Sequence, residues 1–110
     1  MKGSGFMRIQ AKFGCRRDEN HKEIVAYLEE LGYVVLDLSP MGKGVPDVIV
    51  SEKKANAQMW LAEIKDGDDK DFTPAQYDFQ ATWKGRAILF FAKKDDVDTF
   101  HFMVTTGNLP

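Results

Sequence analysis

Two apolar, strand-like runs in this chain carry charged residues that a buried strand ordinarily excludes. The first run, VPDVIV, spans residues 45–50, and the second, WLAEIK, spans residues 60–65. They place Asp47, Glu63 and Lys65 in segments whose other residues are mostly apolar. Burying an unpaired carboxylate costs several kcal/mol, so these groups need compensating partners. A divalent metal ion is the obvious candidate, because it binds hard carboxylate oxygens.

Taken one at a time, these charges have ordinary structural explanations. Asp47 follows Pro46, and most Pro-Asp pairs are turns at the start of a strand. Glu63 and Lys65 are two residues apart, so on a strand they project from the same face and can form a solvated ion pair. For each residue in isolation, that explanation is the better one.

The combination of the three residues favours metal-assisted phosphoryl chemistry. Residues 51–58 are polar and short enough to join the two runs as an antiparallel hairpin, which would bring Asp47, Glu63 and Lys65 to one end of a sheet. The two carboxylates and the carbonyl of Ile64 supply oxygen ligands for Mg²⁺ or Mn²⁺. The Lys65 ammonium can then hold an attacking water and balance phosphate charge, while the metal stabilises the charge that develops.

Hydrophobic periodicity predicts two helices and five strands around these residues. An amphipathic helix is expected over residues 17–32, with Asp18 or Asn20 as the N-cap and Gly32 at the end. A second helix is expected over residues 74–84, after an N-cap threonine and a proline. Apolar or alternating runs predict strands at residues 33–38, 45–50, 59–65, 87–92 and 100–104. The resulting order is α-β-β-β-α-β-β, an α/β fold.

The composition indicates one small domain without a global nucleic-acid signature. At 110 residues and 44% hydrophobic content, residues 1–110 fit a single domain with a modest core. The 15 Lys and Arg residues against 17 Asp and Glu residues give a net charge of −2, so DNA contacts must come from local patches. A single cysteine favours a reducing cytoplasm and excludes a multi-cysteine zinc site. No run is long enough to span a membrane, and residues 1–7 are expected to be flexible.

These residues and the segments around them resemble the PD-(D/E)-x-K nucleases. WLAEIKDG at residues 60–67, TPAQ at 73–76 and WKG at 83–85 are similar to the VRR-Nuc branch and to small phage-type nucleases. That branch carries a Val-Arg-Arg-type signature near its final strand, but the comparable region of this chain, residues 83–87, reads WKGRA. The Arg16-Arg17 pair lies near the N-terminus instead. The resemblance implies a restriction-endonuclease-like core, with a mixed central β-sheet flanked by helices.

The resemblance also implies two further site residues. In this superfamily an acid on the first core helix commonly completes the metal site, which gives Glu23 a catalytic and metal-binding role. The alternative for Glu23 is an exposed helix acid, which is a common residue. Gln76 matches a glutamine that organises the active site or binds DNA, and the first-turn amides of its helix favour a phosphate. Weaker candidates among the acids are Asp18, Glu19, Glu29 and Glu30.

Basic residues close to these segments are the candidate contacts to the DNA backbone. They are Arg8, Lys12, Arg16, Arg17, Lys22, Lys43, Lys84 and Arg86. Phe79 and Trp83 are four residues apart on the second helix, and that spacing favours packing against a sheet over stacking on bases. His21 and His101 have no spacing that suits a metal pair.

The residues and the resemblance together predict a cytoplasmic Mg²⁺- or Mn²⁺-dependent DNA endonuclease. The resemblance alone implies a bacterial or phage-infected cell. Single-domain members of this group often act as homodimers on branched DNA, because two twofold-related sites match two symmetric strands. A Holliday junction resolvase is accordingly the specific expectation. The alternatives are a nicking or restriction-type endonuclease on linear DNA and a nuclease-derived DNA-binding module without catalysis.

Overall fold

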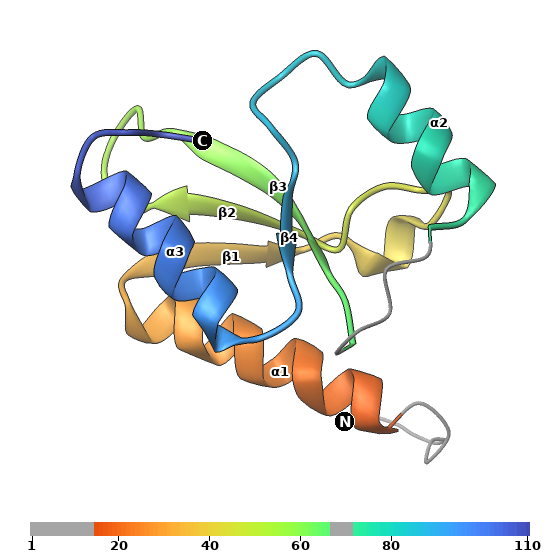
Figure 1. The fold of residues 1–110 in the computed structure, drawn as a ribbon, viewed down its shortest axis with the longest axis horizontal. Helices are drawn as coiled ribbons and strands as arrows, with labels where there is room; N and C mark the ends of the chain where they lie inside the picture. The colour runs from red at the N-terminus through yellow and green to blue at the C-terminus, as the bar shows by residue number, and fades with distance from the viewer. Residues whose placement is uncertain (1–14, 67–71) are drawn as a thin grey trace.

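A computed structural model of the chain describes residues 15–66 and 72–110, with the backbone alone for residues 15–18. The elements follow the order α1 (Cys15–Glu30), β1 (Tyr33–Asp37), the 3₁₀ helix η1 (Ser39–Met41), β2 (Val48–Glu52), β3 (Met59–Ile64), α2 (Pro74–Thr82), β4 (Leu89–Phe91) and α3 (Lys94–Thr105). Figure 1 shows α1 and α3 lying together across the sheet, with α2 set apart from them. The flexibility expected for residues 1–7 lies outside the described residues.

The four strands form one mixed sheet in the order β1-β2-β3-β4. β1 with β2 and β2 with β3 are antiparallel, whereas β3 with β4 is parallel. The antiparallel hairpin predicted between residues 45–50 and 59–65 is confirmed, with Val48 opposite Ala62. One step further in the same register sets Asp47 opposite Glu63. The protein is thus a small α/β domain in which helices flank a mixed sheet.

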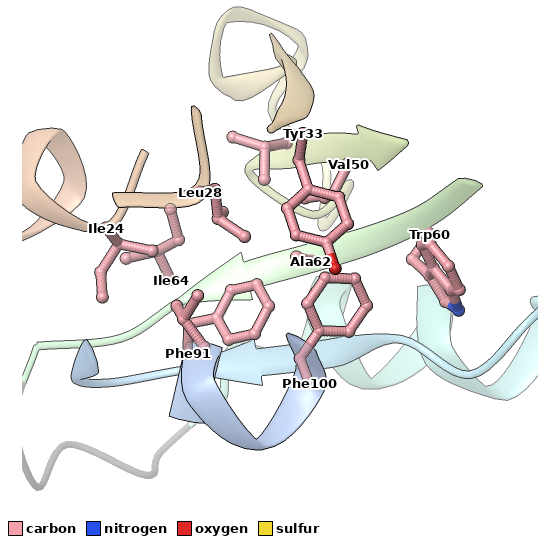
Figure 2. Packing of buried hydrophobic residues seen from close by; sticks show 11 residues of the cluster. Ile24, Leu28, Tyr33, Val50, Trp60, Ala62, Ile64, Phe91 and Phe100 are labelled. Atoms are coloured by element: carbon pink, nitrogen blue, oxygen red, sulfur yellow. The ribbon is translucent and has the colours of Figure 1, made fainter. Parts of the chain in front are cut away.

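The hydrophobic core lies between one face of the sheet and the pair α1 and α3. Ile24 and Leu28 from α1 meet Val97 and Phe100 from α3 over the buried side chains of the strands. Figure 2 shows these side chains gathered around Ala62 and Ile64 of β3. The ring of Phe100 contacts three other aromatic rings, those of Tyr33, Trp60 and Phe91, at centroid distances of 5.1, 5.0 and 5.8 Å.

The strand predicted at residues 100–104 is wrong, because this segment lies inside α3. Its aromatic and polar residues alternate, but burial follows the helical spacing: Phe100 is 3% exposed and Phe102 is 66% exposed. Asp96 fixes the start of the helix, where its Oδ2 accepts hydrogen bonds from the N–H groups of Ala92 and Lys93 at 2.7 and 3.1 Å. The sheet therefore has four strands, not five.

The N-cap predicted for the first helix is also wrong. Asn20 lies inside α1, five residues after Cys15, and cannot cap the start of that helix. The predicted end is confirmed, since the helix stops at Glu30 and Gly32 follows with φ +101°, a conformation that glycine adopts without strain. Within the described residues, no helix is long and apolar enough to cross a membrane.

Substitution of two phenylalanines in α3 tests the helical assignment. Phe100→Ala is expected to lower the free energy of unfolding by about 3–5 kcal/mol, because it leaves a cavity among packed rings. Phe102→Ala is expected to change it by less than about 0.5 kcal/mol, because that side chain is solvated. Urea unfolding of both variants measures the difference. Similar losses would contradict the helix, since a strand would direct both rings to one face.

Candidate active site

Asp47 is held at the end of the sheet by its backbone and its side chain. Its carbonyl accepts a hydrogen bond from the N–H of Leu38 at 2.7 Å, which continues the pairing of β1 with β2. Its Oδ2 accepts a hydrogen bond from the N–H of Ile64 at 2.8 Å, across the hairpin. Among the described residues, the other oxygen, Oδ1, has no hydrogen-bond partner. The carboxylate is therefore oriented by one oxygen and keeps the second available to a ligand.

Glu63 and Lys65 are charged side chains that the fold removes from water. They are 4% and 5% exposed, and Lys65 Nζ lies 3.9 Å from Glu63 Oε2. Lys65 Nζ also lies 4.4 Å from the centroid of the Phe72 ring, a distance typical of a cation–π contact. A buried ion pair contributes little net stability, but removing one partner leaves an uncompensated charge. The presence of the pair is therefore weak evidence for a stabilising role.

Gln76 connects Glu63 to the start of α2 through a capping box. The Thr73 hydroxyl accepts a hydrogen bond from the N–H of Gln76 at 3.2 Å, and Gln76 Oε1 accepts one from the N–H of Thr73 at 2.8 Å. Because a backbone N–H can only donate, the side-chain oxygen of Gln76 must face it. The amide nitrogen is then left to donate to Glu63 Oε2 at 2.9 Å. The helix cap thus orients a donor toward the carboxylate.

Gly44 brings the loop before Asp47 against the same helix. Its φ is +80°, and a Cβ at this position would lie 2.2 Å from the carbonyl oxygen of Ala75. Any larger residue would push the loop away from the first turn of α2. Glycine is therefore required where the segment that carries Asp47 meets the helix that carries Gln76.

Asn20 ties α1 to the ends of the two parallel strands. Its Nδ2 donates hydrogen bonds to the carbonyl oxygens of Lys65 at 2.7 Å and Ala92 at 3.3 Å. These carbonyls follow directly after β3 and β4, where the sheet offers them no further strand partner. Sequence analysis missed this role, although a signal exists. Asn20 stands four residues before Ile24 and eight before Leu28, so it is the polar residue that continues the buried stripe of the helix.

A cavity of about 330 Å³ opens at this end of the sheet beside Asp47 and Lys65. Its remaining walls come from the first described turns of α1, from the end of β1 and the residues that follow it, and from the end of β3. Most of these residues were not predicted, because they become neighbours only through the pairing of β1 with β2 and the packing of α1. They are Asn20, His21, Lys22, Asp37, Ser39 and Ile64.

The structure does not bring Glu23 to this cavity. Its side chain is exposed on α1, whereas the preceding residues His21 and Lys22 form part of the wall. Residues two apart in an α-helix project from nearly opposite faces, so Glu23 projects away from the side on which His21 lines the cavity. The third acid that the resemblance implies is therefore not placed with Asp47 and Glu63.

The predicted DNA contacts are only partly described. Lys43 and Lys84 are exposed, and Lys43 has φ +56° in the loop before Asp47. Arg86 is exposed and donates to Gln58 Oε1 and to the carbonyl oxygen of Pro110, each at 2.9 Å. Arg8 and Lys12 lie outside the described residues, and for Arg16 and Arg17 only the backbone is described.

The donor set suits a hard divalent cation that retains water. Asp47 and Glu63 provide carboxylates, and Ile64, whose N–H orients Asp47, provides the adjacent carbonyl. Within residues 15–66 and 72–110, no group of three or more His, Cys, Asp and Glu side chains is placed to hold a metal. A fully protein-ligated zinc site is therefore not formed by these residues. One or two carboxylates with several waters is the usual arrangement for Mg²⁺.

Comparison with known proteins gives no relative for this chain. No family model, no curated protein sequence and no solved structure matches it. The functional assignment therefore rests on the residues and the geometry of the site.

Two substitutions at the start of α2 separate the cap from the contact with Glu63. Thr73→Ala is expected to cost about 1 kcal/mol, the usual loss for an N-cap hydroxyl. Gln76→Ala removes the other half of the capping box and also a donor to the buried Glu63 carboxylate, so it is expected to cost about 1–3 kcal/mol more than Thr73→Ala. Denaturant unfolding of both variants provides the comparison. Equal losses would show that the contact with Glu63 adds nothing beyond the cap.

Proposed function

We propose that this protein is a Mg²⁺- or Mn²⁺-dependent endonuclease that hydrolyses phosphodiester bonds in DNA. The observation that carries the proposal is the buried Glu63–Lys65 ion pair. Its glutamate lies opposite Asp47 in the hairpin register and accepts a hydrogen bond from Gln76 of α2. A structural ion pair would need no second carboxylate with an available oxygen at the same end of the sheet. A site for a metal ion and a phosphate needs both the buried ion pair and the second carboxylate.

Each residue has a role that follows from its contacts. Asp47 presents Oδ1, while the N–H of Ile64 holds its other oxygen. Glu63 Oε2 accepts a hydrogen bond from the Gln76 amide and lies beside the Lys65 ammonium. The Lys65 ammonium neutralises phosphate charge and orients an attacking water. When bound, the divalent ion would lower the pKa of a coordinated water and offset negative charge on the phosphate.

The surroundings of the site also favour a phosphodiester. Lys22 and Lys65 line the cavity together with Asp37 and Asp47, so positive and negative groups meet around one volume. A phosphate would pair with the lysines, and a cation bound between the phosphate and the carboxylates would pair with the acids. The α-β-β-β-α-β part of the chain, with its mixed sheet, supports a restriction-endonuclease-like core. Branched DNA, cut by a homodimer, is the substrate that the resemblance to small phage-type nucleases favours.

Cleavage of labelled four-way junction, flap and linear duplex DNA with Mg²⁺ or Mn²⁺ tests the proposal. Asp47→Asn and Lys65→Met are expected to lower the rate by about 100-fold or more, because each removes a charge that the reaction requires. Matched controls come from the ion pair at the opposite end of the same hairpin, Glu52 and Lys54, which lie 3.7 Å apart. Glu52→Gln and Lys54→Met are expected to retain native rates.

The pattern of products separates the possible activities. Symmetric nicks in the junction indicate a resolvase, and similar cutting of every substrate indicates a general or nicking nuclease. No metal-dependent cleavage, or cleavage that both Asp47→Asn and Lys65→Met leave unchanged, would overturn the catalytic proposal and favour a DNA-binding module.

A further inference from the structure

A second hollow lies between α2 and the segment that leads into β4. Its volume is about 240 Å³, and its walls include Gln80, Trp83, Arg86, Ile88 and Phe90. We call it the Trp83 cleft. Its residue types are aromatic, apolar, amide and cationic, in contrast to the carboxylates of the candidate active site. This combination suits a nucleotide better than a metal ion.

Trp83 presents a fixed aromatic surface in this cleft. It is 39% exposed, whereas the other tryptophan, Trp60, is 1% exposed in the core. The indole stacks on Phe79 with a centroid distance of 5.7 Å and an interplanar angle of 18°, and its Nε1 donates to the carbonyl oxygen of Arg86 at 2.7 Å. At Gly85, a Cβ would lie 2.5 Å from the indole ring, so only glycine lets the chain pass this closely. The ring is therefore held in place while part of it stays accessible.

The polar groups around the ring match the parts of a nucleotide. Lys84 and Arg86 are exposed cations on either side of Gly85, where they can meet phosphates. Gln80 lines the cleft, and among the described residues its side-chain amide has no hydrogen-bond partner. An amide that offers both a donor and an acceptor can pair with the edge of a base.

The Trp83 cleft is linked to the candidate active site through Phe90. Phe90 stands beside Glu63 in the register of β3 and β4, so both side chains leave the sheet on the same face. Phe90 also forms, with Lys65 and Phe72, the wall of a third hollow of about 200 Å³, and the rings of Phe72 and Phe90 are 5.3 Å apart. Lys65 in turn lines the cavity beside Asp47. Lys65 is thus common to the first and third hollows, and Phe90 is common to the third hollow and the Trp83 cleft.

We infer that the Trp83 cleft binds an unpaired nucleobase of the DNA strand whose phosphate lies at Asp47 and Lys65. This inference rests on the proposed function and narrows its substrate to DNA with a single-stranded segment at the site of cleavage. Bases within a duplex are covered on both faces by their neighbours, whereas an unpaired base has a face available to an aromatic side chain. The expectation that Trp83 only packs against the sheet does not account for its exposed ring or for the charged groups beside it.

Binding of oligo(dT) of about 10 nucleotides, in EDTA so that no cleavage occurs, tests the inference. Trp83→Ala is expected to weaken binding by about 10-fold or more, with Trp83→Phe between that variant and the native protein. Phe102→Ala, which removes a still more exposed aromatic ring from α3, is the control and is expected to bind like the native protein. Native affinity in both Trp83 variants would overturn the inference.

A second readout uses the native chain alone. Acrylamide quenches the exposed Trp83 and not the buried Trp60, so bound oligo(dT) should protect the fluorescence while an equal amount of paired duplex should not. Equal protection by both, or protection by neither, would contradict an unpaired base in the cleft. Cleavage of duplex DNA by the native protein without Trp83-dependent binding would overturn only this inference. Trp83-dependent binding without any cleavage would overturn only the proposed nuclease function.

Discussion

The structure depends most on the burial of Glu63 beside Lys65. Placing a carboxylate and an ammonium where each is about 95% shielded from water is costly, and their separation of 3.9 Å recovers only part of that cost. Further compensation comes from contacts that include the Gln76 amide and the ring of Phe72. An apolar pair at this position would be no less stable, so stability alone does not account for the two buried charges.

The elements around this pair fix the positions of its side chains and of Asp47. The capping box that begins α2 also fixes which end of the Gln76 amide faces Glu63, so one set of hydrogen bonds serves both helix and site. Gly44 allows the loop before Asp47 to touch that helix, and Asn20 anchors the carbonyl of Lys65 to α1. Distortion of any of these contacts would move a charged group of the proposed site, and the rate of a reaction at such a site depends on this geometry.

Local patterns in the sequence were sufficient for the parts of the fold that depend on neighbouring residues. The hairpin that sets Asp47 opposite Glu63, the Thr73 cap and the end of α1 all follow from turn chemistry and periodicity. Residues 100–104 were misassigned because alternation over five residues fits a strand, and only packing against the sheet selects the helix. Asn20 was missed for a similar reason, since its partners lie 45 and 72 residues away.

The central claim is that Asp47 and Glu63 act together as a binding site for a divalent cation, and thermal or urea unfolding in Mn²⁺ tests it most directly. A site restricted to the folded state raises the free energy of unfolding by about 2.7 kcal/mol when the ion is at about 100 times its Kd. The account predicts that increase for the native protein and for Glu52→Gln, and its loss in Asp47→Asn. No increase in the native protein, or the same increase in Asp47→Asn, would contradict the account.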